Sequence, residues 1–292
     1  MDTRRQTLTF EVPLALTPVR FSLILATVGR TVELSKFLLH LERQSYRNFE
    51  LIVVDQNPDD RLIPILAPYS DRLTVKHLRS KKGLSRARNV GLHSVSGDVV
   101  AFPDDDCWYA PTTLERVAGF FCEHPDWNGI TGRVNAKNTF PFLDGKDGFL
   151  NRVNVWHRAT SITIFLRVEV VRMVGDFDPL LGAGSESGLG CAEEIDYLLR
   201  ALEKKYRIYY RSDLLIDHPD ELVYDDRLLQ KGYSDSRAAG YTLRKHQFPF
   251  WFVSYRMLRA LGGAALSFGR YNLPKARYHW AIFRGRLSGW LG

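Results

Sequence analysis

Short apolar runs alternate with helical patterns along the first two hundred residues, and this alternation constrains the fold most strongly. FSLILAT (21–27) and FELIVVD (49–55) are continuous runs of β-formers, as expected for strands buried on both faces of a parallel sheet. Between them, TVELSKFLLHLERQ places apolar residues on one helical stripe, with Thr31 as the N-cap. Together they predict one β-α-β unit.

The pattern continues after this unit. We expect strands in LTVKHL (73–78), DVVAF (98–102) and SITIFL (161–166), with helices in LSRARNVGLHSV, PTTLERVAGFF and AEEIDYLLRALEKK. The sequence therefore predicts an α/β fold with a Rossmann-like, mostly parallel central sheet flanked by helices. Ligands of such sheets bind at the carboxyl ends of the strands, so the residues that follow the strands are the first site candidates.

Three consecutive aspartates, Asp104, Asp105 and Asp106, follow the strand at 98–102. Each close pair would repel by roughly 4 kcal/mol at about 4 Å and an effective dielectric near 20, so the cluster needs either water or a cation. Carboxylates spaced as Asp-x-Asp suit Mg²⁺ or Mn²⁺, and Mg²⁺ binds one or two carboxylates together with substrate phosphates. Asp104 and Asp106 are therefore candidate metal ligands, and Asp105 contacts the bound ligand or faces water.

Basic side chains surround a glycine at the start of the helix in KKGLSRARNVGL. Lys81, Lys82, Arg86 and Arg88 flank Gly83 there, and cations at a helix start are natural contacts for phosphate or ribose. The structural alternative is a helix face in contact with solvent.

A second acidic motif, CAEEIDYLLRAL, places Glu193, Glu194 and Asp196 in the first turns of a helix. The helix dipole favours acids there, and Asp196 can pair with Arg200 one turn later. The preceding loop, GAGSESGLG, is suited to admit a substrate over a catalytic carboxylate. Further on, His218 in DLLIDHPD is either structural or a third ligand of an Asp, Asp, His set.

The net charge of +7 is concentrated at one end of the chain. Residues 227–292 contain twelve Lys or Arg and one acid, a charge of +11, so the rest of the chain sums to −4. Because no basic stripe lies on the main domain, we expect no nucleic-acid partner.

Apolar and basic residues interleave in this tail. Arginines interrupt every apolar run before it reaches the ~20 residues that span a bilayer. Phe252, Tyr255, Leu258 and Leu261 are spaced as one face of a helix, which predicts an amphipathic helical appendage lying on an anionic membrane surface. The alternative is a helix packed on the main domain with its basic face in water.

The cysteines and the N-terminus bear on the compartment. The three cysteines are widely spaced and form no Cys-x-x-Cys pair, as expected for reduced thiols. The apolar run VPLAL is too short for a secretory signal. We therefore expect a cytoplasmic protein that is peripheral on the inner face of the cell membrane.

In their order, these motifs resemble glycosyltransferase family 2, whose fold is GT-A. The resemblance covers residues 20–220 and rests on SLILATVGR, LERQSYRNFELIVVDQ, GLSRARNVGL, GDVVAFPDDDCW, GAGSESGLGCAEEIDYLLRAL and DH. It implies an inverting, Mn²⁺- or Mg²⁺-dependent transfer of a sugar from a nucleotide-sugar donor, preferably a UDP-sugar, to a hydroxyl. The implied acceptor is a saccharide or a polyprenyl-diphosphate-linked saccharide of bacterial polysaccharide or cell-surface glycan synthesis.

The resemblance also implies residue roles. Glu194 matches the catalytic base, with Glu193 as the alternative; the acceptor side includes Trp108 and Asp196. The donor-side residues are Thr27, Arg30, Asp55, Gly83, Arg88, Asp104 and Asp105, and the metal ligands are Asp104, Asp106 and His218. The chain departs from the family where Gln56-Asn57-Pro58 replaces Asp-Gly-Ser, and where Glu194 replaces the common Asp.

We expect three regions and keep two rival functions. The regions are an N-terminal extension (1–19), a GT-A catalytic domain (20–225, nucleotide-binding to 106 and acceptor-binding from 107) and a basic helical tail (226–292). One rival is nucleotidyl transfer on a similar sheet, whose Gly-rich basic signature is reduced here to ATVGRTVELS. The other is a non-enzymatic membrane-binding module, in which the three aspartates are dispensable.

Overall fold

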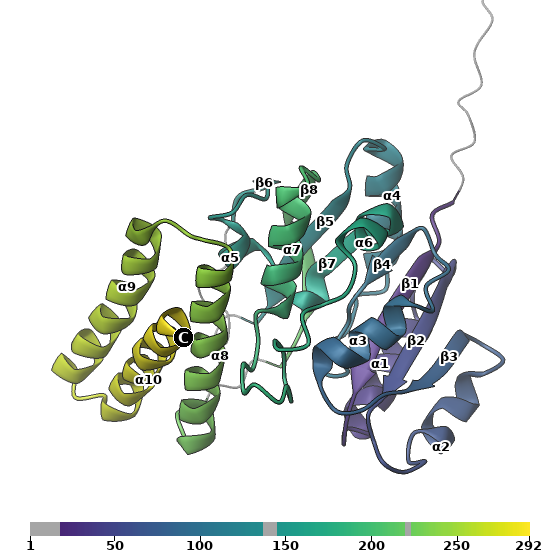
Figure 1. The fold of residues 1–292 in the computed structure, drawn as a ribbon. Coiled ribbons are helices and arrows are strands. Elements are labelled where there is room, and N and C mark those ends of the chain that lie inside the picture. The colour runs from purple at the N-terminus through teal and green to yellow at the C-terminus, as the bar shows by residue number, and fades with distance from the viewer. Residues whose placement is uncertain (1–17, 137–144, 220–222) are drawn as a thin grey trace, which may run out of the picture.

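The computed structural model describes residues 18–136, 145–219 and 223–292 (Figure 1). The predicted N-terminal extension lies outside these ranges apart from residues 18 and 19. Among the described residues, one eight-stranded sheet has the order β3-β2-β1-β4-β7-β5-β8-β6. Its strands are β1 (Phe21–Thr27), β2 (Phe49–Asp55), β3 (Thr74–Arg79), β4 (Val99–Ala101), β5 (Gly129–Asn135), β6 (Gly148–Phe149), β7 (Ile164–Arg167) and β8 (Ile208–Asp217).

The half of the sheet formed by β3, β2, β1 and β4 is parallel, as predicted. Thr27 lies opposite Asp55 in the β1–β2 register, so the ends of these two strands meet. β7 runs antiparallel between β4 and β5, which makes the complete sheet mixed. The predicted α/β fold is confirmed, and the parallel half brings its polar strand ends to one edge.

Helices cover both faces of the sheet because the strands bury both sets of their side chains. Leu23 and Leu25 of β1 pack on one side with α1 and α4, while Ile24 and Ala26 pack on the other with α3, α6 and α7. The α-helices of the main domain are α1 (Val32–Glu42), α2 (Ile63–Leu66), α3 (Leu84–Leu92), α4 (Thr113–Glu123), α5 (Val155–Arg158), α6 (Val168–Val174) and α7 (Glu193–Glu203).

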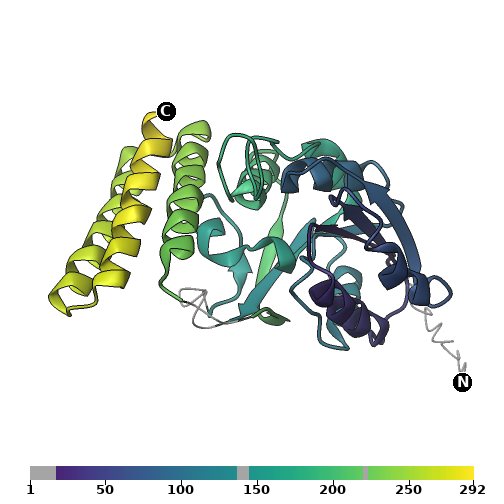
Figure 2. The same cartoon turned by 90° about the horizontal axis from the view of Figure 1, so that it is seen from below.

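The tail forms three helices beside the main domain: α8 (Asp226–Lys245), α9 (Phe250–Gly269) and α10 (Leu273–Leu291) (Figure 2). α8 and α10 approach closely because glycines face the partner backbone. A Cβ on Gly289 would collide with the carbonyl oxygen of Arg237, and one on Gly240 with that of Arg286. The expected boundary near residue 226 stays a prediction, although α8 begins there.

Candidate active site

The three aspartates lie just after β4, beside the end of β1, and guanidinium groups neutralise them. Thr27 Oγ1 donates a hydrogen bond of 2.5 Å to Asp105 Oδ2. Arg30 Nη1 lies 2.8 Å from Asp105 Oδ1 and also pairs with Asp106. The structure thus brings together Thr27, Arg30 and the cluster, as the sequence predicts, and side-chain cations offset part of the repulsion.

Arg88 connects this cluster to α7, because it pairs with Asp104 and with Glu193. Its side chain is only 1% exposed, with Nη1 2.7 Å from Glu193 Oε1 and Nη2 3.0 Å from Asp104 Oδ1. The guanidinium carbon lies 5.9 Å from the ring centre of Phe102 and 5.7 Å from that of Phe177. A buried guanidinium paired with two carboxylates positions both of them, so we assign Arg88 the role of positioning Asp104 and Glu193. Its contact with the donor stays a prediction.

Glu193 and Glu194 begin α7 but have different surroundings. Glu193 is 4% exposed and is paired with Arg88. Burial, reinforced by the charge of Glu193, raises the pKa of Glu194 to about 8. In the part of the chain that the structure describes, Glu194 forms no ion pair. A carboxylate with a raised pKa and no bound cation is suited to accept a proton, whereas Glu193 is engaged.

The loop before α7 also contacts the start of α3. Leu84 N donates to Ala183 O at 2.9 Å, and Ser85 Oγ donates to Leu181 O at 2.6 Å. Gly83, which has φ +128°, donates its N–H to Gln56 Oε1 at 2.8 Å. The loop that the sequence predicts to be flexible is therefore hydrogen-bonded to the start of α3. Gln56, one of the residues at which the chain departs from the family pattern, accepts the N–H of Gly83.

Asp55 is fully buried at the end of β2, between groups that the sequence analysis missed. Its Oδ2 lies 3.0 Å from His77 Nε2 and 3.0 Å from Arg79 Nη1, both on β3. Its Oδ1 accepts a hydrogen bond of 2.8 Å from the backbone N–H of Asn57. The available signal was the β2–β3 register, in which Asp55 lies opposite Arg79. A contact between Asp55 and the nucleotide stays a prediction.

His218 reaches the cluster through a backbone bridge. Trp108 N donates to Asp217 O at 3.0 Å, and Asp217 N donates to Trp108 O at 3.2 Å. This places His218 Nε2 3.7 Å from Asp106 Oδ1. The ring of Trp108 stacks on His40 with ring centres 5.8 Å apart. The acceptor-side role of Trp108 stays a prediction.

Asp196 is engaged away from the proposed base. Its carboxylate is fully buried and pairs with Arg200, Lys245 and His246 at 3.0, 2.7 and 2.9 Å. Burial opposes its ionisation, but the hydrogen bonds from His246 and Lys245 prevail and lower its pKa to about 2. We therefore withdraw Asp196 from the acceptor side: it ties α7 to the end of α8.

The cluster contains side chains of the kinds that bind divalent metal ions. Within residues 18–136, 145–219 and 223–292, no three His, Cys, Asp or Glu side chains are arranged to hold a metal ion by themselves. Asp104, Asp106 and His218 nevertheless offer the oxygen and imidazole ligands that Mn²⁺ and Mg²⁺ accept. Burial raises the pKa of Asp104 despite the opposing charge of Arg88, so a second cation nearby would favour its ionised form.

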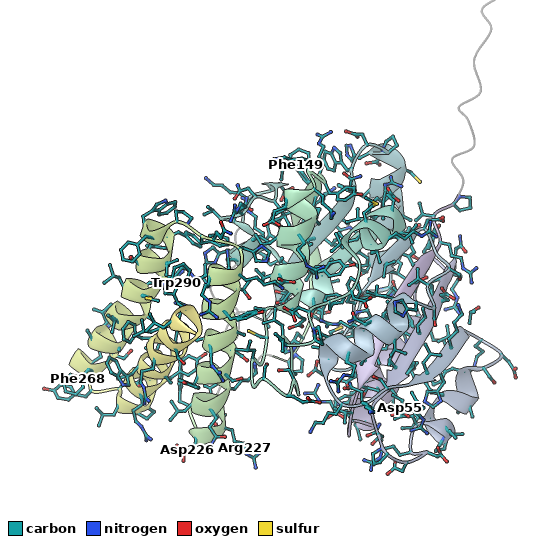
Figure 3. The ribbon with its side chains drawn as sticks, viewed as in Figure 1. Asp55, Phe149, Asp226, Arg227, Phe268 and Trp290 are labelled. Atoms are coloured by element: carbon teal, nitrogen blue, oxygen red, sulfur yellow. The ribbon has the colours of Figure 1, made fainter. Side chains whose placement is uncertain are left out.

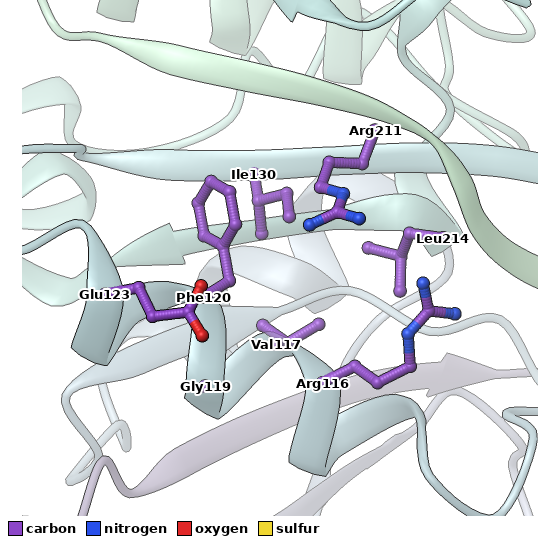
Figure 4. Close-up of a pocket in the computed structure, with 8 residues that line it drawn as sticks. All are labelled: Arg116, Val117, Gly119, Phe120, Glu123, Ile130, Arg211 and Leu214. Carbon is purple, nitrogen blue, oxygen red and sulfur yellow. The ribbon is translucent and has the colours of Figure 1, made fainter.

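A separate pocket of about 220 Å³ lies between α4 and the β5–β8 strands (Figure 4). Arg116 and Arg211 line it, and both pair with Asp213, at 2.8 and 2.7 Å. None of the predicted site residues lines this pocket, so we assign it no role in the reaction.

Comparisons with known proteins show what the sequence and the fold are similar to. Residues 22–163 match the family described as Glycosyl transferase family 2. An uncharacterized glycosyltransferase of Haemophilus influenzae is 32% identical over 109 residues, which is 37% of this chain and only 37% of that relative's length. The glycosyltransferase AglE of Haloferax volcanii is 25% identical over 274 residues, covering 88% of this chain and 83% of AglE.

Two solved structures share the fold at low sequence identity. The mannosyltransferase PcManGT of Pyrobaculum calidifontis, in complex with GDP-Man and Mn²⁺, has a TM-score of 0.64 and 15% identity over 95% of this chain and 91% of its own. S. aureus TarS 1–349 in complex with UDP-GlcNAc has a TM-score of 0.57 and 15% identity over 91% and 92%. The ordered motifs, the sheet and these matches show that residues 22–163 match glycosyltransferase family 2 and that the chain has the GT-A fold.

Proposed function

We propose that the chain transfers a sugar from a nucleoside diphosphate sugar, preferably a UDP-sugar, to a hydroxyl of a saccharide or a polyprenyl-diphosphate-linked saccharide. The reaction is a metal-dependent single displacement with inversion, in bacterial polysaccharide or cell-surface glycan synthesis. The observation that carries the proposal is two neighbouring sets of ion pairs. Arg30 pairs with Asp105 and Asp106, and Arg88 pairs with Asp104 and with Glu193, which is next to Glu194.

The donor side is assigned to the edge where β1, β2 and β4 end. Asp105, fixed by Thr27 and Arg30, orients the donor, and Asp55 and Gly83 border the nucleotide. Asp104 and Asp106, with His218, would hold Mn²⁺ or Mg²⁺. Such an ion would neutralise the charge that develops on the leaving diphosphate. The complexes of PcManGT with GDP-Man and Mn²⁺ and of TarS with UDP-GlcNAc support a nucleotide-sugar donor.

Glu194 acts on the opposite side of the donor sugar. Its carboxylate accepts the proton of the acceptor hydroxyl as that oxygen bonds to the anomeric carbon, while the bond from this carbon to the diphosphate oxygen breaks. Attack opposite the leaving group inverts the anomeric configuration. Arg88 pairs with Glu193 and Asp104 and so fixes the position of the base helix relative to the donor.

Donor binding is expected to protect the fold. A nucleotide sugar with Mn²⁺ should raise the melting temperature, because a ligand bound only to the folded state stabilises it. A screen of UDP- and GDP-sugars by thermal unfolding, with and without Mn²⁺, measures this. Protection by nucleoside triphosphates but by no nucleotide sugar would favour the rival nucleotidyl transfer.

We also propose that α9 attaches the enzyme peripherally to an anionic membrane. No helix among the described residues is long and apolar enough to cross a bilayer. Trp251, Tyr255, Leu258 and Leu266 form an exposed stripe along α9, each more than half exposed. Phe268 extends from the outer end of the bundle (Figure 3) and is 67% exposed. An apolar stripe on a basic bundle is typical of interfacial helices.

The predicted apolar face of this helix is divided between two uses. Phe252 is 2% exposed and packs with the core of the catalytic domain, whereas Tyr255 and Leu258 face outward. Packing on the main domain and an exposed apolar stripe therefore coexist in one helix.

Serine at Trp251, Leu258 and Leu266 should abolish flotation with vesicles that contain phosphatidylglycerol, because the apolar contact area is lost. The matched control replaces exposed apolar residues of the catalytic domain, Val32, Ile63 and Leu180, by serine and should float like the wild type. Equal flotation of the α9 variant would contradict attachment through this stripe.

A further inference from the structure

Two arginines meet where the tail helices pack on the catalytic domain. Arg286 of α10 donates a hydrogen bond through Nη1 to the backbone oxygen of Arg256 on α9. The guanidinium carbon of Arg256 lies 4.7 Å from the ring centre of Trp156, on α5. These three side chains therefore join α5, α9 and α10 at one junction.

The junction offers hydrogen-bond donors without acceptors. Arg256 Nη1, Arg286 Nε and Trp156 Nε1 are each buried, and none has a hydrogen-bond partner among the described residues. All three groups can only donate, and two belong to guanidinium groups. Unpaired buried donors are costly, and the group that would satisfy all of them is an anion with several acceptor oxygens.

Neither α9 nor α10 contains a carboxylate that could act as counter-ion. From residue 236 to 292 the chain contains no Asp or Glu. Burial, together with repulsion from neighbouring arginines, lowers the pKa of Arg256 to about 9 and that of Arg286 to about 10. Both remain cations near neutral pH, so the junction carries a partly buried positive charge that the tail leaves uncompensated.

The position of the pair relates it to the acceptor side. Arg286 packs against α8, because a Cβ on Gly240 would collide with the backbone oxygen of Arg286, and α8 in turn contacts Cys191, which lies three residues before Glu194. Cys191 Sγ also contacts the backbone oxygen of Asp235 on α8 at 3.3 Å. α8 thus connects Arg286 to the segment that leads into the base helix.

We propose that Arg256 and Arg286 form a phosphate-binding site for the acceptor. The planar guanidinium groups bind two oxygens of one phosphate each, and Trp156 Nε1 supplies a further donor. The ligand class is the phosphate or diphosphate ester of a prenyl-linked saccharide. That identity rests on the proposed function, whereas phosphate binding at the pair does not.

Thermal unfolding with inorganic phosphate, at constant ionic strength set by chloride, tests the site without any nucleotide sugar. Wild-type protein should melt at temperatures that rise with phosphate concentration. Arg256→Met should lose this rise, and should melt no lower than wild type without phosphate, since removing a buried uncompensated charge relieves its desolvation. Arg270→Met, which removes an exposed arginine after α9, is the matched control and should respond like wild type.

Two results would overturn the site: no response to phosphate in wild-type protein, or an equal response in wild type and in both Arg256→Met and Arg286→Met. The wild-type measurement decides even where a variant fails to fold. Because no donor or turnover is involved, failed sugar transfer leaves this result interpretable, and the reverse also holds.

A second comparison identifies the source of the phosphate. Farnesyl diphosphate in solution should protect wild type more strongly than Arg256→Met, while both should float equally with phosphatidylglycerol vesicles through α9. Loss of flotation in Arg256→Met with unchanged protection by farnesyl diphosphate would show that the pair binds lipid headgroups, and would contradict the acceptor assignment.

Discussion

Replacing Glu194 by glutamine should lower kcat by about 10²- to 10⁴-fold, the usual contribution of a general base. Glutamine keeps the size of the side chain but cannot accept the proton of the acceptor hydroxyl. Glu194→Asp keeps a carboxylate on a shorter side chain and should lose less. The measurement is the rate of nucleoside diphosphate release at saturating donor and acceptor.

The pH dependence gives this prediction a second readout. Only the ionised carboxylate is a base, so wild-type activity should rise with pH through about 8 and fall below it. The free energy of unfolding depends on pH in the opposite direction. A folded-state pKa of about 8, above the ordinary 4.5, means that the folded protein binds the proton more tightly. Stability contributed by this group is therefore present below pH 4.5 and is lost as pH rises toward 8.

Glu194→Gln removes that loss, so it should melt above wild type at pH 9 and close to it at pH 4. Glu169→Gln, at an exposed acid in the first turn of α6, is the matched control and should change neither kcat nor this profile. Full activity in Glu194→Gln would exclude Glu194 as the base. Loss of activity in Glu193→Gln alone, with Glu194→Gln active, would transfer the role to Glu193.

Replacing Asp106 by asparagine should lower metal-dependent turnover by about 10²-fold or more, because charge on the leaving diphosphate is then poorly neutralised. Asparagine retains the shape but removes the negative charge that attracts the divalent ion. Turnover measured against Mn²⁺ concentration should show both a lower maximum and a higher requirement for Mn²⁺. Asp104→Asn should behave similarly, with an added effect from its lost pairing with Arg88.

Asp126→Asn provides the control for that experiment, since Asp126 is an exposed acid paired only with Arg207 among the described residues. It should leave the Mn²⁺ response unchanged. If nucleoside diphosphate release survives with the wild-type metal response in both Asp104→Asn and Asp106→Asn, the metal assignment is wrong.

The sequence predicts the fold and the donor edge well for a physical reason. Strands buried on both faces, such as 21–27 and 49–55, must be apolar throughout, and this signal is local. The ends of parallel strands meet by topology, so the proximity of Thr27 to the aspartates follows from the strand order.

Other features depend on contacts between distant segments. The sequence predicts a nucleotide contact for Arg88 because helix starts bind phosphates, whereas in the structure Arg88 pairs with Glu193, 105 residues away. Asp196 meets His246 across 50 residues, and no local pattern records that pairing. The tail was expected to bind a membrane or to pack; glycines such as Gly289, which permit close packing of α8 and α10, allow both.

The three aspartates posed an electrostatic question that the structure answers in part. Arg30 pairs with Asp105 and Asp106, and Arg88 pairs with Asp104, so the cluster does not rely on water alone. The proposed divalent ion then acts where diphosphate brings further negative charge. In the proposed donor site, the guanidinium groups offset the charge of the aspartates, and the divalent ion would offset the charge of the diphosphate.

The most direct test of the account identifies the phosphate product formed from a nucleotide sugar, Mn²⁺ and a saccharide acceptor. We predict acceptor-dependent release of nucleoside diphosphate by wild-type protein, and its loss in both Asp106→Asn and Glu194→Gln. Release of pyrophosphate from a nucleoside triphosphate, or nucleoside diphosphate release that persists undiminished in both variants, would contradict it.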